Sequence, residues 1–168
     1  VQYSGGTWSL PGRLDATSLP ESAEAAIRTR IAGLSASARA VAQAQALVFQ
    51  GAFTREDYVA LCHGVGSNEP DAVITELVLN QVLVSDGRYY TLSHLGWASS
   101  LAESLDSAEK LERHRTLASL YESRPGLESV RHMLSGGEEA RGIARLFELI
   151  ATVQNSSELR EVFQLDAY

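Results

Sequence analysis

The stretch LNQVLVSDGRYYTLSH, residues 79–94, carries the strongest local signal in the chain. Two runs of β-forming residues, 82–84 and 89–92, flank the dipeptide Asp86-Gly87. Asp-Gly between such runs indicates a hairpin, because a type I′ turn needs positive φ at both of its central positions. We therefore expect a β-hairpin with a two-residue loop, which closes on His94.

Three helices are predicted before this hairpin. Ser35 is placed to cap a helix that ends at Gly51, and Thr54 is placed to cap a second helix that ends at Gly64. Pro70 lies in the first turn of the third helix, EPDAVITELVLNQ. The apolar face of this third helix consists of Val73, Ile74, Leu77 and Val78. Three helices followed by a β-hairpin is the order of a winged helix, a shape usually met on DNA.

The regions on either side of this unit have different patterns. Residues 1–20 are broken by glycines and prolines, which predicts an extended lead-in with one short strand around Trp8. Residues 21–34 then predict a helix. After His94 only helical patterns follow, and they are separated by tight turns at Pro125-Gly126 and Gly136-Gly137. The helical segments are 95–105, 107–124, 127–134, 138–153 and 157–165.

These short helices predict stacked hairpins of a tetratricopeptide-like (TPR-like) or armadillo-like kind, in which each pair buries its apolar face against the next pair. The predicted fold is therefore mainly α. We expect an extended lead-in over residues 1–20, a winged-helix domain over 21–94 and a helical-hairpin domain over 95–168.

The charge of the chain argues against nucleic acid as a partner. The formal net charge is −7 at pH 7, whereas affinity for phosphates comes from lysine and arginine. The third helix, which would enter the major groove, has Glu69, Asp71 and Glu76 and no basic residue. The hairpin offers only Arg88, beside Asp86. DNA is therefore not the expected partner. A DNA-binding transcriptional regulator is the first alternative to the function that is inferred below.

The residue patterns also do not indicate a catalytic or metal site. The histidines at positions 63, 94, 114 and 132 lack the paired spacing of metal ligands, and Cys62 has no second cysteine to pair with. We interpret His114 and His132 as residues of a helix surface or of inter-helix packing. The glycine-containing loop GVGSNEP, residues 64–70, lacks the Gly-Lys-Ser/Thr ending of a phosphate loop. The sequence thus predicts neither an enzyme nor a metal or cofactor site within this chain.

The expected location is the cytoplasm, because no apolar run is long enough to span a bilayer and no leader opens the chain. The chain begins at Val1 rather than at a methionine, and we expect it to be part of a longer polypeptide.

Across nearly its whole length the chain resembles the region that follows the nucleotide-binding core in bacterial signal-transduction ATPases of the STAND type. This class includes maltose-regulator-like activators and the NLR immune receptors. The resemblance lies in the order of several short motifs. They are Trp8, Leu19-Pro20, RIAGLSASAR at 30–39, Gly51-Ala52-Phe53, ELVLNQVLV at 76–84, YTLSH at 90–94, ERHRTLA at 112–118 and RHMLSGG at 131–137.

The resemblance implies a winged-helix regulatory domain followed by the first hairpins of a sensor array. In NLR-type relatives the histidine that closes the wing, within a Met-His-Asp motif, contacts the phosphates of bound ADP, and His94 occupies the matching position. Leu95 stands where the motif has aspartate. The alternative for His94 is a structural role, in which its ring caps the wing by bonding a backbone carbonyl. Trp97 is expected to be a core or hairpin-contact residue rather than part of a ligand site.

The function implied is that of a non-catalytic regulatory and interaction module. It would couple ATP or ADP, bound by a nucleotide-binding domain in the same polypeptide, to a C-terminal sensor domain. A free-standing protein-interaction adaptor, with a protein partner and no nucleotide, is the second alternative. No membrane contact is expected.

Overall fold

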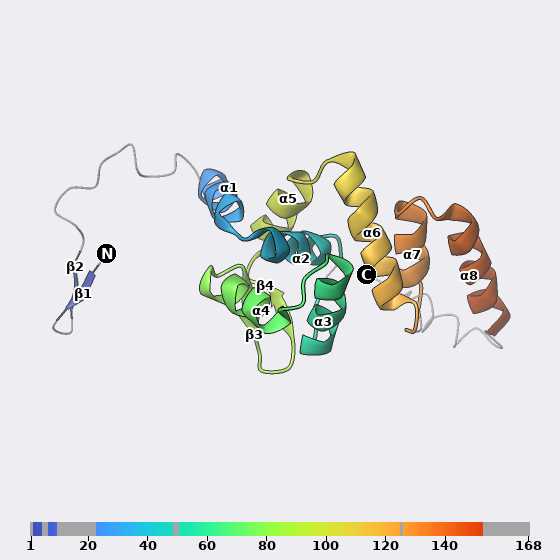
Figure 1. Cartoon of the computed structure of the whole chain (residues 1–168), viewed down its shortest axis with the longest axis horizontal. Coiled ribbons are helices and arrows are strands. Elements are labelled where there is room, and N and C mark those ends of the chain that lie inside the picture. Colours follow the sequence, from blue (N-terminus) through green and yellow to red (C-terminus); the bar gives the residue numbers. More distant parts are fainter. Residues whose placement is uncertain (1, 5–6, 10–22, 49–50, 125, 153–168) are drawn as a thin grey trace, which may run out of the picture.

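The structure is a computed structural model, and it describes residues 2–4, 7–9, 23–48, 51–124 and 126–152 of the 168-residue chain. The chain is mainly helical (Figure 1). In chain order the elements are β1 (Gln2–Ser4), β2 (Thr7–Ser9), α1 (Ala23–Gly33), α2 (Ala36–Ala46), α3 (Arg55–Gly64), α4 (Pro70–Leu79), β3 (Leu83–Ser85), β4 (Tyr90–Leu92), α5 (Leu95–Glu103), α6 (Ser107–Tyr121), α7 (Glu128–Ser135) and α8 (Glu139–Thr152).

The predicted elements are largely present. The strand expected around Trp8 is β2, which pairs antiparallel with β1. The rest of the lead-in and the helix expected over 157–165 lie outside the described residues. Among the described residues, no helix has both the length and the apolar character that crossing a bilayer requires.

Local capping signals explain where several helices begin. The Ser35 side chain accepts a hydrogen bond from the backbone N–H of Ala38 at the start of α2, and Thr54 forms a reciprocal capping box with Asp57 at the start of α3. Both caps confirm the predictions. The predicted end of α2 at Gly51 is wrong, because the helix ends at Ala46 and the next two backbone N–H groups bond back to carbonyls three residues earlier.

The hairpin forms where it was predicted, but its loop differs. Strand β3 pairs antiparallel with β4, and Ser85 opposite Tyr90 is the last pair, so the loop has four residues instead of two. Positive φ occurs only at Gly87 in this loop, which excludes the type I′ turn. The loop is longer than predicted because the Asp86 side chain organises it: its Oδ1 accepts hydrogen bonds from the backbone N–H groups of Arg88 at 2.9 Å and Tyr89 at 2.7 Å.

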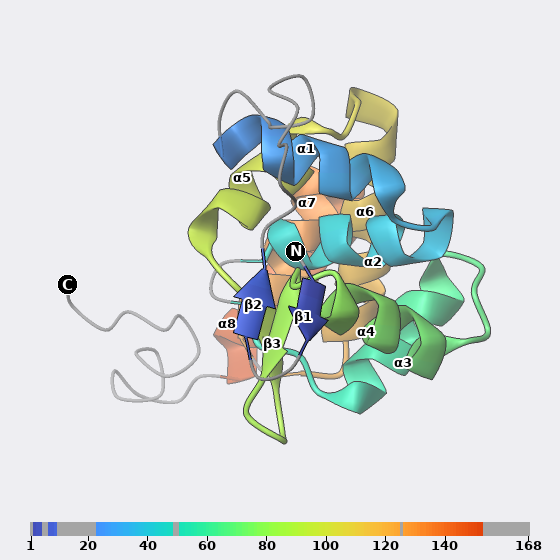
Figure 2. The ribbon, with the colours of Figure 1, turned by 90° about the vertical axis from the view of Figure 1, so that its left-hand side faces the viewer.

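Helix α2 is the central element of the fold. It packs against α3, α4, α5 and α6, and Figure 2 shows it between α1 on one side and α3 with α4 on the other. Its buried residues are Ala38, Ala40, Val41, Ala42, Gln43, Ala44 and Gln45. Most of these side chains are small, so the surrounding helices can approach α2 closely.

The hydrophobic core continues past His94. Trp97 and Leu101 of α5 and Leu117 of α6 are buried in the same cluster as the apolar residues of α1 to α4. Trp97 is 1% exposed, as expected of a core residue, and Cys62 is buried as well. In α4, Val78 departs from the prediction, because it is 40% exposed and lies outside the buried face of the helix.

Helices α6, α7 and α8 lie side by side in a row at the end of the molecule opposite α1 (Figure 1). Helix α6 packs against both α2 and α3 and also against α7, while α7 packs against α8. Helix α6 therefore connects the central helices to the helical row.

Candidate functional site

His94, the residue singled out by the sequence, lies between the hairpin and α5. Its backbone is extended, and it is the N-cap residue of α5, but its side chain makes no capping hydrogen bond to the first turn of this helix. The imidazole is exposed, and its ring centroid lies 5.8 Å from that of Trp97. An exposed imidazole beside an open helix N-terminus can donate to an anion, and the helix dipole favours the same charge.

Gly96 keeps the His94 ring against the first turn of α5. A Cβ atom added at position 96 would lie 3.1 Å from both Cε1 and Nδ1 of His94, and 3.2 Å from Cδ1 of Ile27. Any side chain at this position would therefore press on the imidazole and on the end of the Ile27 side chain, and these groups would have to shift by a few tenths of an ångström. Residue type alone does not reveal this role of Gly96, because it depends on the position of a ring two residues away.

A cavity of about 330 Å³ adjoins the His94 ring. Its walls come from the end of α2, from β4 and from the start of α5, and they are mostly apolar. The lining residues are Gln45, Val48, Gly51, Thr91, Leu92, His94, Leu95 and Ala98. The cavity could accept an apolar or planar group that lies next to an anion bound at His94.

Buried polar contacts fix the wall of this cavity. The Gln45 side-chain amide donates to the carbonyls of Gly51 at 2.8 Å and Tyr90 at 3.0 Å, and its oxygen accepts a hydrogen bond from the Tyr58 hydroxyl. Phe53 and Tyr90 pair through two backbone hydrogen bonds, which attach the segment before α3 to β4. Burial raises the pKa of Tyr58, so the hydroxyl stays a donor. The end of the hairpin is thus held to α2 and α3 by neutral hydrogen bonds.

The acidic residues of α4 hold that helix in place. Asp71 accepts two hydrogen bonds from the Arg55 guanidinium, at 2.7 and 2.6 Å, and this pairing lowers the pKa of Asp71. Glu76 accepts hydrogen bonds from the backbone N–H and the hydroxyl of Ser35, at 2.7 and 2.6 Å. These acids attach α4 to α3 and to the start of α2, which gives them a structural role that the sequence analysis did not assign.

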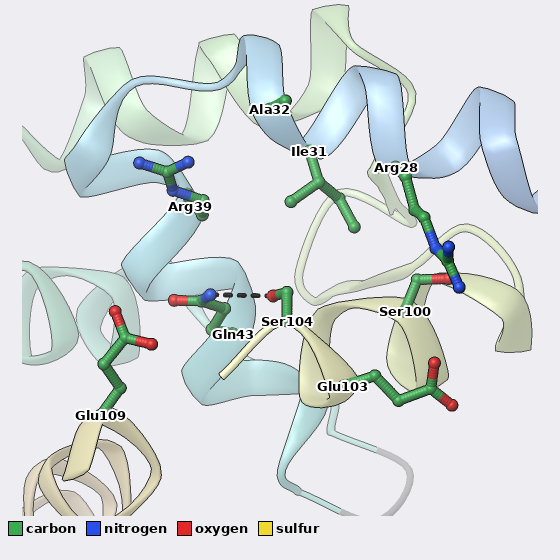
Figure 3. A pocket seen from close by; sticks show the side chains of 9 residues that line it. All are labelled: Arg28, Ile31, Ala32, Arg39, Gln43, Ser100, Glu103, Ser104 and Glu109. Carbon is green, nitrogen blue, oxygen red and sulfur yellow. Dashed lines mark hydrogen bonds between the residues drawn. The ribbon is translucent and has the colours of Figure 1, made fainter. Parts of the chain in front are cut away.

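A second, larger pocket of about 570 Å³ lies between α1, α2, α5 and the start of α6 (Figure 3). Its lining mixes arginine, glutamate, serine and amide side chains. In one wall, Gln43 Nε2 donates to Ser104 Oγ at 3.0 Å. Sequence reasoning missed this pocket, because its residues come from four separate helices. Its polar lining suits water or a small polar ligand better than an apolar one.

His114 and His132, expected to be surface or packing residues, meet between α6 and α7. Their Nδ1 atoms lie 2.8 Å apart in a buried environment. No third histidine, cysteine or acidic residue joins them in a metal-binding group, within the part of the chain that the structure describes.

No protein-family model, curated protein or solved structure matches this chain. The resemblance to signal-transduction ATPases therefore stays a prediction that rests on the motifs of the sequence.

Proposed function

We propose that this chain is a non-catalytic regulatory and interaction module of a larger STAND-type signalling ATPase. In this proposal, residues 21–94, with α1 to α4 and the β3–β4 hairpin, form a winged-helix domain, and α5 to α8 begin a TPR-like or armadillo-like array over residues 95–168. The order of the elements and the pairing of Phe53 with Tyr90, which adds a third strand-like segment to the hairpin, support this interpretation. The module would dock on a nucleotide-binding domain in one state and be released in the other.

The observation that carries the proposal is the position of His94. Its imidazole is exposed beside the uncapped first turn of α5, so it is accessible to a phosphate held by a neighbouring domain. An anion at this point would accept hydrogen bonds from the ring and interact favourably with the helix dipole.

The first experiment is to read the coding sequence upstream of Val1. We expect it to encode a phosphate loop with the Gly-x-x-x-x-Gly-Lys-Ser/Thr pattern. An upstream region without such a pattern would overturn the proposal and favour a free-standing protein-interaction adaptor.

The second experiment measures ADP affinity of the full-length protein by calorimetry. Loss of one hydrogen bond to a charged group costs about 1.5 to 3 kcal/mol, so His94→Ala should weaken ADP binding about tenfold or more. Gly96→Ala, which keeps the histidine but displaces its ring, should also weaken binding. His63→Ala, at an exposed position in the last turn of α3, is the matched control and should have no effect. Unchanged ADP affinity in the His94 variant would refute the phosphate contact.

Direct DNA binding is the competing function, and it is tested by fluorescence anisotropy with labelled duplex DNA over a salt titration. The exposed face of α4 carries no arginine or lysine, so we expect no binding at physiological ionic strength. A salt-dependent increase in anisotropy at that ionic strength would replace our proposal with a DNA-binding regulator.

A further inference from the structure

The contact between α6 and α7 contains a pair of buried histidines. His114 is 7% exposed and His132 is fully buried, and their Nδ1 atoms are 2.8 Å apart. The ring of Tyr121 stacks on His132 at a centroid distance of 5.7 Å. A hydrogen bond between two imidazoles needs one donor and one acceptor, so at least one Nδ1 must be unprotonated.

Arg131 determines which imidazole is the donor. Its Nη2 lies 3.0 Å from His132 Nε2, and because a guanidinium can only donate, His132 Nε2 must accept. The neutral His132 ring then carries its proton on Nδ1 and donates it to His114 Nδ1. His114 in turn carries its proton on Nε2. Both unprotonated nitrogens of the pair are therefore already occupied as acceptors.

The charged groups around the pair disfavour an added proton. Arg131 of α7 and Lys110 of α6 are positive, and together with burial, the largest cause, they lower the pKa of His114. Burial, Arg131 and His114 lower the pKa of His132 to about 3. Glu128 Oε2 lies 3.5 Å from His132 Nε2, but it accepts two hydrogen bonds from Arg131, at 3.0 and 2.7 Å.

Among the described residues, the neighbouring elements contribute a backbone carbonyl and two acids that are paired with arginines. At the end of α2, the Leu47 carbonyl accepts from Arg131 at 3.3 Å. In α3, Asp57 pairs with Arg124, which lies over the ring of Tyr121. On the α8 side, Glu138 pairs with Arg141 at 2.9 Å. The nearby acids are thus engaged by arginines.

We propose that the His114–His132 pair is an acid-sensitive latch, which holds α7 and α8 against α6 while both rings are neutral and releases them when either ring takes up a proton. A proton added to His114 Nδ1 would face the N–H of His132, and a proton added to His132 Nε2 would face the N–H groups of Arg131. Either event replaces an attractive contact with two opposed donors. In the released state both rings are hydrated and titrate freely.

Hydrogen exchange of the backbone amides in this chain tests the latch. With an ordinary histidine pKa near 6.5, protonation at pH 5.5 favours the released state about tenfold for each ring, so two rings give about a hundredfold increase in opening relative to pH 7.5. After correction for intrinsic exchange rates, the amides of α7 and α8 should lose protection by this factor. Amides of α2 that exchange by local opening, without unfolding of the whole chain, should change much less and serve as the internal reference.

Substitution of one ring separates the histidines from other acid effects. His114→Asn keeps an acceptor for His132 but cannot be protonated, so the loss of protection should fall to about tenfold. His63→Asn, on the exposed surface of α3, should leave the hundredfold response unchanged. An equal response in wild type and His114→Asn would overturn the proposal.

The wild-type protein provides a second measurement that does not depend on how the variants fold. Nitrogen-15 NMR of the imidazoles at pH 7.5 should show the His132 proton on Nδ1 and the His114 proton on Nε2. A proton on Nε2 of His132, or α7 amides whose protection is the same at pH 7.5 and 5.5, would refute the latch.

Discussion

The interior around α2 and the contact between α6 and α7 are built from different chemistry. The buried residues of α2 are all apolar or neutral, and the hydrogen bond from the Tyr58 hydroxyl to Gln45 carries no charge. Between α6 and α7, by contrast, two histidines and Arg131 are in contact. A neutral interior keeps its stability over the physiological pH range, whereas a histidine contact does not. The proposed latch therefore places a pH response in the helical row and not in the interior around α2.

The largest effect is expected from breaking the apolar core. Trp97→Ala removes a side chain that is 1% exposed and connects α5 to the helices before the hairpin. The loss of buried area and the resulting cavity should lower the free energy of unfolding by about 3 to 5 kcal/mol. Urea denaturation followed by circular dichroism measures this change. Leu95→Ala, in the same helix but at a position 88% exposed, should change it by less than about 0.5 kcal/mol, and equal effects would contradict the assignment of Trp97 to the core.

A smaller effect is expected where the central helices meet the helical row. A Cβ atom at Gly64, the last residue of α3, would lie 2.4 Å from Thr116 Cγ2 of α6. Thr116 cannot easily rotate away, because its hydroxyl donates to the Glu112 carbonyl at 3.2 Å. We expect Gly64→Ala to cost about 1 to 3 kcal/mol of unfolding free energy in chemical denaturation.

Gly33 provides the matched control for that variant. It is the last residue of α1, and a Cβ atom added there would meet no heavy atom within 4 Å. Gly33→Ala should therefore be neutral or slightly stabilising, since it reduces the conformational entropy of the unfolded chain. Equal stability of the Gly64→Ala and Gly33→Ala variants would contradict the close approach of α3 and α6.

The pattern of local signals explains how much of this fold the sequence predicts. The predictions of caps at Ser35 and Thr54 are confirmed, because each cap depends on residues within one helical turn. The prediction of the hairpin is confirmed for the same reason. The prediction of its two-residue loop is wrong, because hydrogen bonds to the Asp86 side chain replace the backbone turn that Asp-Gly usually forms. A side chain that competes with the backbone is hard to foresee from residue type alone.

The candidate sites depend on distant residues, and there the sequence predicts less. His114 and His132 are 18 positions apart, and their ring contact depends on how the turn between α6 and α7 aligns the two helices. The polar pocket takes residues from four helices, so no single stretch contains its pattern (Figure 3). His94 was singled out because it closes the predicted hairpin and matches the histidine of the Met-His-Asp motif, and both signals lie within one short stretch of sequence.

The pH dependence of global stability tests the contribution of the His114–His132 pair in the helical row. The pKa values of His114 and His132 are lowered in the folded state, so the unfolded chain takes up protons first as the pH falls. The stability that the neutral pair contributes is present above pH 6.5 and is lost below it, by about 1 kcal/mol for each histidine between pH 7 and 5.5. Denaturation midpoints at several pH values measure this slope. His114→Asn should reduce the slope by about half, and a slope unchanged by that substitution would exclude the histidines as its source.

The smallest effect on stability is expected at His94, whose ring is exposed and does not cap α5. If the ring had the structural role of bonding a backbone carbonyl, His94→Ala would cost about 1 kcal/mol. If the ring is kept free for an anion, the same variant should unfold within about 0.5 kcal/mol of the wild type, because the His94 side chain makes no hydrogen bond to the described residues. Chemical denaturation of the two proteins separates these roles. A clear loss of stability would assign His94 to the fold, whereas an unchanged midpoint together with weaker ADP binding in the full-length protein would assign it to a ligand.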